Sequence, residues 1–357
     1  MEKVLVAMSG GVDSSVAAAL LVRAGYKVFG VTLRLWACDD ESAHKKACCG
    51  LDQVTHARGV ADRLGIPHYV IDESASFDRQ ILRYAWDEYN HGRTPNPCIL
   101  CNEHIKFGAL LRKARALGAA WIATGHYARI RRDGGLPAPV LCRGEDLQKD
   151  QSYFLFSLSR EQLDHTLFPI GEQTKQEVRR IAREEGFSNA DRAESQDACL
   201  LADDGGFAEA LRLRFNATEQ PGHLVDPEGK RLGRHGGIHR FTVGQRRGLG
   251  IALGRPAYVS GIDPDNNEVT ISTESRDLIS QGLEAADVRW STGGIELLRE
   301  PCPENSDPGS LEDRLVPGAE PTDKDHSPSP RLDAADDACP RFVEGIPLLA
   351  QIRYRHR

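Results

Sequence analysis

The chain has 357 residues and a formal net charge of −7 at pH 7. This length predicts two or three domains, and the acidic balance argues against generalised nucleic-acid binding without excluding a local basic face. No apolar run approaches the ~20 residues that cross a membrane. The nine cysteines, an odd number in a chain without a signal-peptide pattern, favour a reducing compartment, so we expect a cytoplasmic protein.

A glycine- and serine-rich loop, SGGVDSS at residues 9–15, follows the apolar run 4–8 and precedes the Ala/Val/Leu-rich run 16–24. This pattern predicts a buried strand, a tight turn and a helix. Glycines let the backbone approach an anion, and the N–H groups and dipole of a helix N-terminus attract phosphate. Asp13 stands beside this predicted phosphate site, and a carboxylate there indicates a cation such as Mg²⁺. An ordinary βα turn capped by serines is the alternative interpretation.

The loop lacks the lysine of a Walker loop and the spacing of the G-x-G-x-x-G dinucleotide fingerprint. It resembles instead the SGGxDS loop of the PP-loop ATP pyrophosphatases. Those enzymes cleave ATP between the α and β phosphates and adenylate an oxygen of their substrate.

The first half of the chain alternates strands and helices. Further strands are predicted at 28–35, 68–71 and 121–124, and helices at 54–64, 77–89 and 105–117. This order predicts an α/β fold in which helices cover both faces of a parallel sheet. Because ligands of such sheets bind at the carboxyl ends of the strands, we expect residues 9–15 and the pair Gly125-His126 to line one crevice. A lone histidine is more often a satisfied polar group, but this position favours a functional one.

Two cysteine-containing segments are candidates for nucleophilic chemistry. In GRTPNPCILCNEHIKF, residues 92–107, Cys101 is expected where the following helix begins, and a helix N-terminus lowers the pKa of a thiol. Cys199 lies in the polar loop ESQDAC at 194–199 rather than in an apolar stretch. The alternatives are a buried structural cysteine and a metal site. Zinc is disfavoured, because the pair Cys48-Cys49 lacks the usual two-residue spacing, and we assign no metal ligands.

Six motifs, read in order, resemble the tRNA-specific 2-thiouridylase (MnmA) family over residues 1–267 and again at 352–354: SGGVDSS, GRTPNPCILCNEHIKF, ATGHYAR, KDQSYFL, ESQDAC and FTVGQRRGLGI. The resemblance implies a PP-loop sheet of the adenine nucleotide α-hydrolase type. It implies ATP contacts at Ala7, Met8, Ser9, Gly10, Gly11, Val12, Asp13, Ser14, Leu33 and Gly125. It implies contacts with the target base at Asn96, Pro97 and Cys98, and with the rest of the tRNA at Lys149, Asp150, Gln151, Arg353 and Tyr354. Leu33 stands where methionine is frequent in the family, and Cys98 where aspartate is common.

The same resemblance implies a sulfurtransferase that thiolates C2 of the wobble uridine (U34) of tRNA. ATP adenylates the C2 oxygen, Cys199 carries sulfur as a persulfide, and Cys101 is the nucleophilic or resolving cysteine, with Asp13 and His126 completing the catalytic set. The target base is expected to flip into a closed pocket. Expected partners are tRNA and a sulfur donor such as a cysteine desulfurase or a sulfur-relay protein, and the expected state is a monomer. A second route would place an iron–sulfur cluster on Cys98, Cys101 and Cys199.

Three domains are predicted: the PP-loop catalytic domain at 1–205, a small basic tRNA-contacting domain at 206–255, and a truncated β-barrel at 256–357. No acidic residue stands between Glu228 and Asp263, whereas basic residues accumulate at Lys230, Arg231, Arg234, Arg240, Arg246, Arg247 and Arg255. In an acidic chain such an island favours a phosphate-backbone site over a merely solvated face. Residues 301–340 are rich in Pro, Asp, Glu and Ser and predict a disordered insertion.

Two other functions fit part of the pattern. Another PP-loop adenylating ligase on a small substrate would need ATP but not the cysteines, so alkylation of Cys101 and Cys199 would leave it active. A non-catalytic, ATP-gated tRNA-binding protein would use the basic island but release no pyrophosphate. We prefer the thiouridylase, because neither alternative accounts for the paired cysteines.

Overall fold

The computed structural model of the protein describes residues 1–36, 51–132, 138–192 and 206–279. Cys48-Cys49, Cys199, Arg353, Tyr354 and the predicted insertion at 301–340 therefore lie outside the described residues. The chain divides into the units Met1–Leu278 and Ile279–Arg357, and nearly all described residues belong to the first.

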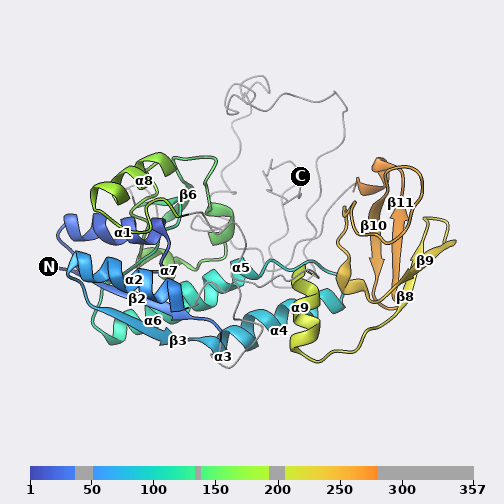
Figure 1. Ribbon diagram of the computed structural model, residues 1–357, viewed down its shortest axis with the longest axis horizontal. Coiled ribbons are helices and arrows are strands. Elements are labelled where there is room, and N and C mark those ends of the chain that lie inside the picture. The colour runs from blue at the N-terminus through green and yellow to red at the C-terminus, as the bar shows by residue number, and fades with distance from the viewer. Residues whose placement is uncertain (37–50, 133–137, 193–205, 280–357) are drawn as a thin grey trace, which may run out of the picture. The chain divides into compact units, whose positions relative to one another are not determined.

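Five parallel strands form the central sheet, in the order β3-β2-β1-β4-β7 (Figure 1). They are β1 Lys3–Ala7, β2 Lys27–Arg34, β3 His68–Asp72, β4 Trp121–Ala123 and β7 Thr166–Leu167. β1 lies in the middle, where Val4 pairs with Val28 of β2 on one side and Trp121 of β4 on the other. Because these strands are parallel, the loops that follow β1 and β4 leave the sheet at the same edge.

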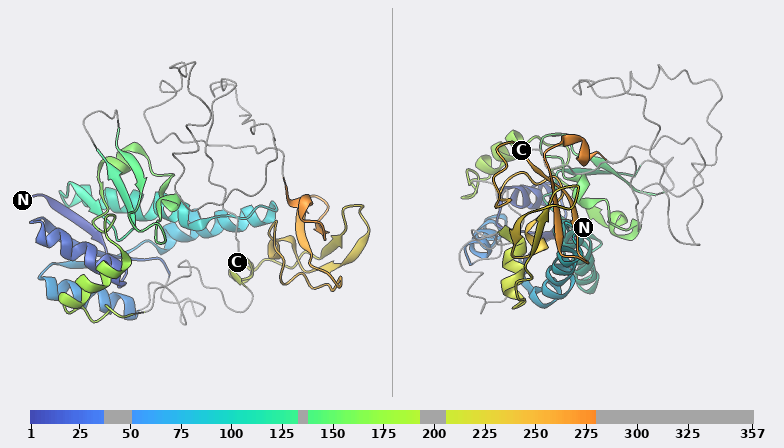
Figure 2. Two further views of the ribbon diagram at one scale, coloured as in Figure 1. Left: turned by 90° about the horizontal axis from the view of Figure 1, so that it is seen from above. Right: turned by 90° about the vertical axis from the view of Figure 1, so that its right-hand side faces the viewer.

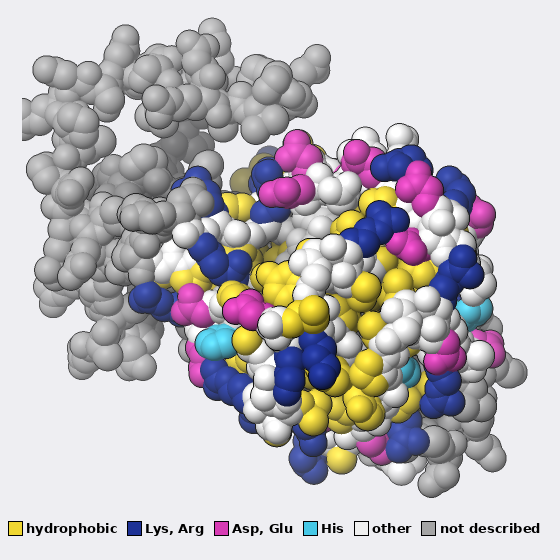
Figure 3. Space-filling model, turned by 90° about the vertical axis from the view of Figure 1, so that its left-hand side faces the viewer, with side chains coloured by type: hydrophobic (Ala, Val, Ile, Leu, Met, Phe, Trp, Pro, Cys, Tyr) yellow, Lys and Arg dark blue, Asp and Glu magenta, His cyan; other side chains and the backbone are white. Residues whose placement is uncertain are grey.

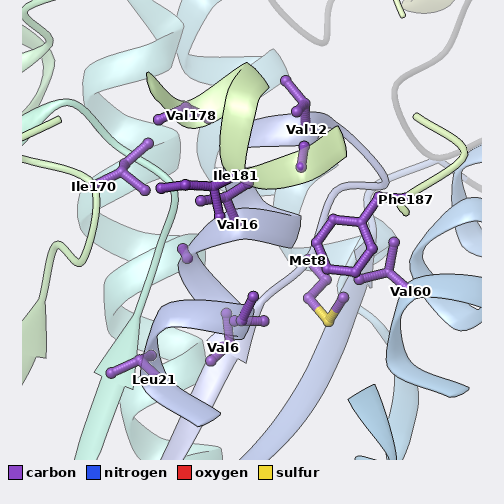
Figure 4. Close-up of a cluster of buried hydrophobic side chains, with 14 of the residues drawn as sticks. Val6, Met8, Val12, Val16, Leu21, Val60, Ile170, Val178, Ile181 and Phe187 are labelled. Atoms are coloured by element: carbon purple, nitrogen blue, oxygen red, sulfur yellow. The ribbon is translucent and has the colours of Figure 1, made fainter. Parts of the chain in front are cut away.

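One face of the sheet is covered by α1 (Val12–Arg23), α2 (Leu51–Leu64) and α8 (Lys175–Glu184). In the buried cluster drawn in Figure 4, Val178 and Ile181 of α8 lie close to Val16 of α1. Val178 and Ile181 stand three positions apart, so they present one apolar stripe of the helix to the core.

The opposite face is covered by α6 (Leu110–Ala116). Val4 and Val6 of β1 point into the first cluster, whereas Leu5 between them packs with Leu110 in the second. All three β1 residues are fully buried, as a central strand of a doubly covered parallel sheet must be. The predicted α/β fold is confirmed.

Two long helical segments connect β3 to β4. The first contains α3 Ser74–Phe77, the wider π-type turn η2 Asp78–Leu82 and α4 Arg83–Asn90; the second contains α5 Pro97–Leu100, the π-type η3 Cys101–Ala109 and α6. Asn96 is the N-cap of the second segment, and Pro97 occupies its first turn, where proline is favourable. The prediction that this helix starts at residue 105 was wrong, because a proline suits the first helical turn as well as a loop.

Shorter elements follow β4. They are the antiparallel pair β5 Ala128–Arg131 and β6 Val140–Arg143, the 3₁₀ turn η4 Ser152–Leu155, and α7 Arg160–Asp164. α8 then begins at a capping box, in which Thr174 and Glu177 each accept a hydrogen bond from the other's backbone N–H. This cap fixes the first turn of α8, including Lys175.

A second, four-stranded sheet follows α9 (Gly206–Arg214), in the order β10-β11-β8-β9. Its strands are coloured from yellow to orange in Figure 2. Its elements are β8 Gly222–Val225, β9 Arg231–His235, η5 Ile238–Arg240, β10 Tyr258–Asp263, β11 Glu268–Ser272 and η6 Ser275–Leu278. Leu224, Phe241 and Val269 share its core. This sheet crosses the predicted domain boundary after residue 255. The predicted boundary divides the strands of this sheet between two domains, because the glycines and arginines of β8 and β9 obscure the alternation of apolar and polar residues that is typical of a strand.

The face of the molecule in Figure 3 carries acidic and basic side chains close to one another, with apolar side chains between them. No field of a single sign dominates that face. Among the helices of the described residues, none combines the length and the apolar character that crossing a membrane requires.

Replacing Leu5 with alanine should lower the free energy of unfolding by about 2–5 kcal/mol, because Leu5 is fully buried in the middle strand. Urea unfolding measures the change. Leu117→Ala is the matched control: Leu117 is 49% exposed, so its truncation should change the stability by no more than about 0.5 kcal/mol. Equal losses in the two variants would contradict the central place of β1.

Candidate active site

The loop between β1 and α1 is held by its own serines. The Ser14 hydroxyl accepts a hydrogen bond from the Ser9 N–H at 3.2 Å and donates one to the Gly11 carbonyl oxygen at 3.1 Å. The Ser15 hydroxyl donates to the same carbonyl oxygen at 2.9 Å. Ser14 and Ser15 are buried and serve the loop's own backbone. Backbone N–H groups at the start of α1 are therefore the principal donors that this loop can offer an anion.

Gly10 and the distant Asn189 fix the turn from outside the loop. Gly10 has a φ of +75°, and a Cβ there would lie 2.4 Å from the carbonyl oxygen of Gln53, so a side chain is excluded. Asn189 is 1% exposed, and its Nδ2 donates to the Gly10 carbonyl oxygen and to Ser15 Oγ, both at 2.9 Å. Nothing in the sequence marks Asn189 as a partner of this loop, because 179 residues separate it from Gly10 and its local sequence carries no motif.

Gly125, directly after β4, lies against the first turn of α1. A Cβ on Gly125 would stand 2.5 Å from the Ser14 backbone nitrogen and 2.6 Å from the carbonyl carbon of Asp13. The structure thus brings the loops after β1 and β4 together at one edge of the sheet, as the strand order requires. Any larger residue at position 125 would displace the N-terminus of α1.

Asp13, in the first turn of α1, forms a part-buried ion pair with Lys175, in the first turn of α8. Lys175 Nζ lies 2.7 Å and 2.8 Å from the two carboxylate oxygens, and the Tyr127 hydroxyl donates to one of them at 2.8 Å. Lys175 itself is 8% exposed. The positive charge beside Asp13 in the protein itself is the ammonium group of Lys175. The sequence contains the capping-box pattern before α8, but it does not indicate that Lys175 pairs with Asp13, 162 residues away.

The apolar members of the predicted ATP set mostly contribute to the core. The side chains of Met8 and Val12 lie in the cluster of Figure 4, so only their backbone groups can meet a phosphate. Ala7 and Leu33 are partly buried against the cluster on the other face of the sheet. Leu33, at the end of β2, keeps some accessible surface for an apolar ligand group.

His126 is a neutral histidine in an aromatic environment. Its ring centroid lies 5.8 Å from that of Phe107 and 6.1 Å from that of Phe168. Its Nδ1 lies 2.7 Å from the Thr124 hydroxyl oxygen. Burial, with a smaller effect from the positive charge of Lys106, lowers the pKa of His126 to about 3. At neutral pH the imidazole can make hydrogen bonds, but it does not carry the second proton of a general acid.

Cys98 and Cys101 lie in the first two turns of the helix that begins at Pro97. Cys98 is half-buried, whereas Cys101 is 6% exposed and belongs to a core cluster with Phe77 and Ile105. The expectation that Cys101 stands at the helix start was wrong. Since the effect of a helix dipole falls off after the first turn, it acts on Cys98 more than on Cys101. Cys199 lies outside the described residues, so its pairing with Cys101 stays a prediction.

Some of the side chains predicted to contact the base and the tRNA already form hydrogen bonds within the protein. Asn96 is the N-cap of the helix that carries Cys98, and within the described structure its buried Nδ2 has no hydrogen-bond partner. Asp150 accepts hydrogen bonds from backbone N–H groups of its own loop, and Gln151 Oε1 accepts one from the Tyr127 N–H. Asp150 and Gln151 therefore shape this loop, and Lys149 beside them is half-buried.

The basic residues between 229 and 262 are all exposed. One of them, Arg240, is neutralised by Glu219 at 2.6 Å and Glu209 at 3.2 Å. Arg246 and Arg255 line a pocket of about 490 Å³ formed by the glycine-containing segment 246–257. A phosphate-binding surface at these residues stays a prediction.

The site fits a nucleotide better than it fits a bare metal ion. A side chain is excluded at Gly10 in the loop after β1 and at Gly125 after β4, and the backbone N–H groups at the start of α1 beside them suit phosphate groups. Among the described residues, no group of three His, Cys, Asp or Glu side chains converges to hold a metal. A divalent cation would therefore depend on phosphate oxygens for most of its ligands. The cysteine set of the alternative cluster includes Cys199 and lies partly outside the described residues.

Two domain families match this chain. Residues 2–203 match a family described as the tRNA methyl transferase HUP domain, and residues 213–273 match one described as the tRNA methyl transferase PRC-barrel domain. The second match spans residue 255, as the sheet of β8 to β11 does.

The chain is also similar to proteins named tRNA-specific 2-thiouridylase MnmA. That of Carboxydothermus hydrogenoformans is 47% identical over 291 residues, which cover 81% of this chain and 79% of that protein. That of Moorella thermoacetica is 48% identical over 291 residues, covering 81% of both chains. That of Geobacter metallireducens is 47% identical over 293 residues, covering 81% of this chain and 79% of that protein.

Replacing Lys175 with methionine should weaken ATP binding by about tenfold or more, because the Asp13 carboxylate would then face the phosphates without its counter-charge. Isothermal titration calorimetry measures the affinity. Lys175→Arg keeps the charge and should retain most of the binding, and Lys113→Met tests an exposed lysine of α6. Unchanged ATP affinity in Lys175→Met would refute this role.

Replacing His126 with asparagine should flatten the pH dependence of stability on the acid side of neutrality. The pKa of His126 falls from 6.5 to about 3 on folding, so below pH 6.5 the unfolded chain binds a proton that the folded protein does not. The wild-type free energy of unfolding should therefore decline as the pH drops from about 6.5 towards 3. Urea unfolding at a series of pH values measures the slope, and identical slopes in the two proteins would contradict the neutral state of this half-buried histidine.

Proposed function

This chain belongs to the tRNA-specific 2-thiouridylase family, and we propose that it replaces the C2 oxygen of the wobble uridine of tRNA with sulfur in a reaction that consumes ATP. The observation that carries the proposal is the 47% identity to a 2-thiouridylase over 79% of that protein's length. The nucleotide cradle formed by residues 9–15 and Gly125 supports it, because such a reaction needs ATP beside the substrate.

We assign ATP binding to the edge of the sheet where β1 and β4 end. The backbone from Ala7 to Ser14 binds the phosphates. Gly125, which has no side chain, lets ATP approach the backbone closely, and Leu33 borders the adenine base. Bound ATP supplies the AMP group that activates the uridine oxygen. Mg²⁺ enters with the phosphates, since Lys175 already neutralises Asp13.

The sulfur transfer uses the two cysteines in sequence. The C2 oxygen of uridine is a poor leaving group until adenylation converts it to AMP. The terminal sulfur of a Cys199 persulfide attacks C2 and expels AMP. The Cys101 thiolate then attacks the Cys199 sulfur, breaks the sulfur–sulfur bond, and leaves 2-thiouridine and a Cys101–Cys199 disulfide that an external thiol reduces.

His126 and Asn96 position the base in this scheme. His126 is neutral at the working pH, so it orients its partner through a hydrogen bond rather than by donating a proton as an imidazolium. Asn96 offers a buried Nδ2 donor that suits a uracil carbonyl oxygen. Pro97 and Cys98 follow it in the first helical turn and border the same base.

The partners follow from this chemistry. The tRNA contacts are assigned to Lys149, Asp150, Gln151, Arg353 and Tyr354, and the target base flips out of its loop to reach the pocket. The sulfur donor is a cysteine desulfurase or a sulfur-relay protein. The protein acts as a monomer in the cytoplasm. A cluster on Cys98, Cys101 and Cys199 is the second route, and anaerobic purification without iron or a brown colour would exclude it.

A second candidate function comes from the matched domain families, whose descriptions name a tRNA methyl transferase. Methylation and thiolation add different masses to a nucleoside, so one measurement separates them. The same measurement addresses the two alternatives drawn from the sequence. A small-substrate ligase would leave tRNA unchanged, and a binding protein would release no pyrophosphate.

Incubating unmodified tRNA with the protein, ATP, Mg²⁺ and a persulfide donor should yield 2-thiouridine, detected by mass spectrometry of the nucleosides. Cys199→Ala and Cys101→Ala should reduce thiolation to below about one-thousandth, because each removes a reacting sulfur. Cys142→Ala, in β6, is the matched control and should stay active. Full thiolation by Cys199→Ala, or a methylated product, would refute the assignment.

A further inference from the structure

Tyr153 in η4 is half-buried and Phe156 directly after η4 is exposed, and neither residue has been assigned a role so far. Phe156 is 52% exposed, and its ring centroid lies 6.4 Å from that of Tyr153 with an interplanar angle of 44°. Tyr153 packs edge-on against Phe154, with centroids 5.3 Å apart. Within the described residues neither Tyr153 nor Phe156 belongs to a buried apolar cluster. Packing in the hydrophobic core of the described structure therefore does not account for the aromatic side chains at positions 153 and 156.

This aromatic pair is anchored beside the helix that carries Cys98 and Cys101. η4 packs against α5 and η3, and Asn102 Nδ2 donates to the Phe154 carbonyl oxygen at 2.8 Å. Asn102 is 2% exposed and directly follows Cys101. The pair thus borders the helical turns to which the target base is assigned.

The loop that leads into the aromatic pair is held in one conformation. Gln151 and Tyr127 exchange two hydrogen bonds: Gln151 N–H donates to the Tyr127 carbonyl oxygen at 2.9 Å, and Gln151 Oε1 accepts from the Tyr127 N–H at 3.0 Å. The Ser152 hydroxyl donates to Asp150 Oδ2 at 2.8 Å. A surface fixed in this way loses little conformational entropy when a ligand binds to it.

We propose that Phe156, supported by Tyr153, stacks on an unpaired base next to the target uridine in the tRNA loop. The inference rests on the proposed function. When the target base flips out, its neighbour loses a stacking partner, and proteins that bind unpaired RNA replace such partners with aromatic side chains. Lys149, four residues before Tyr153, adds a positive charge suited to the phosphate that links the two nucleotides.

The test uses an unmodified anticodon stem-loop RNA with 2-aminopurine beside the target uridine. Stacking on an aromatic ring changes the fluorescence of this base analogue. Phe156→Ala should weaken RNA binding by about tenfold and abolish the fluorescence change on binding. Phe156→Trp should restore both signals, whereas Phe156→Leu, which is apolar but has no ring, should not.

Three controls separate stacking from other effects. ATP affinity and the unfolding temperature of Phe156→Ala should match the wild type, and Leu117→Ala, with a side chain 49% exposed, should bind the RNA normally. Wild-type binding by Phe156→Ala, or full rescue by Phe156→Leu, would overturn the proposal, the latter because it indicates a general apolar contact with a protein partner. If the wild type stacks on the probe through Phe156 but makes no 2-thiouridine, the stacking stands and the proposed reaction fails.

Discussion

The close approach of Gly125 to the first turn of α1 is the constraint on which the rest of the site depends. β1 and β4 are parallel neighbours, so the loops that leave them meet at one edge of the sheet. A Cβ at position 125 would stand 2.5 Å from the Ser14 nitrogen, and the two backbones can pack only because none is present. His126 follows Gly125 directly. The absence of one side chain thus sets the distance between the nucleotide loop and the residues assigned to the base.

Segments far away in the sequence complete the nucleotide loop. Lys175 neutralises Asp13, and Asn189 holds the Gly10 carbonyl oxygen, so the chain after β7 stabilises a turn near residue 10. These contacts lie within the protein itself. A site whose donors and charges already stand in place spends little binding free energy on rearrangement, which leaves more of it for catalysis.

Local sequence patterns predicted the elements that depend on interactions between neighbouring residues. Apolar runs and turn glycines predicted four strands of the central sheet, and the SGGVDSS motif predicted the turn after β1. β7 was missed because a strand of two residues has no period to recognise. The start of the helix at Pro97 was missed because proline suits both a loop and a first helical turn.

The features that the sequence did not predict depend on tertiary contacts between distant residues. The polar partners of Asp13 and Gly10 are chosen by the fold from many similar side chains, so no local motif marks Lys175 or Asn189. The second sheet likewise depends on the pairing of β8 with β11, in which His223 lies opposite Glu268, 45 positions later. Composition alone assigned these two strands to different domains.

The burial of Cys101 governs how its sulfur meets small molecules. A side chain that is 6% exposed inside an apolar cluster is shielded from peroxide and from adventitious alkylating agents in the resting protein. The same shielding limits the surface of Cys101 that another sulfur atom can approach. The turns that begin at Cys101 are π-type, a geometry less regular than the α-helix on either side. A buried thiol and a π-type turn thus meet in one short helical segment, η3.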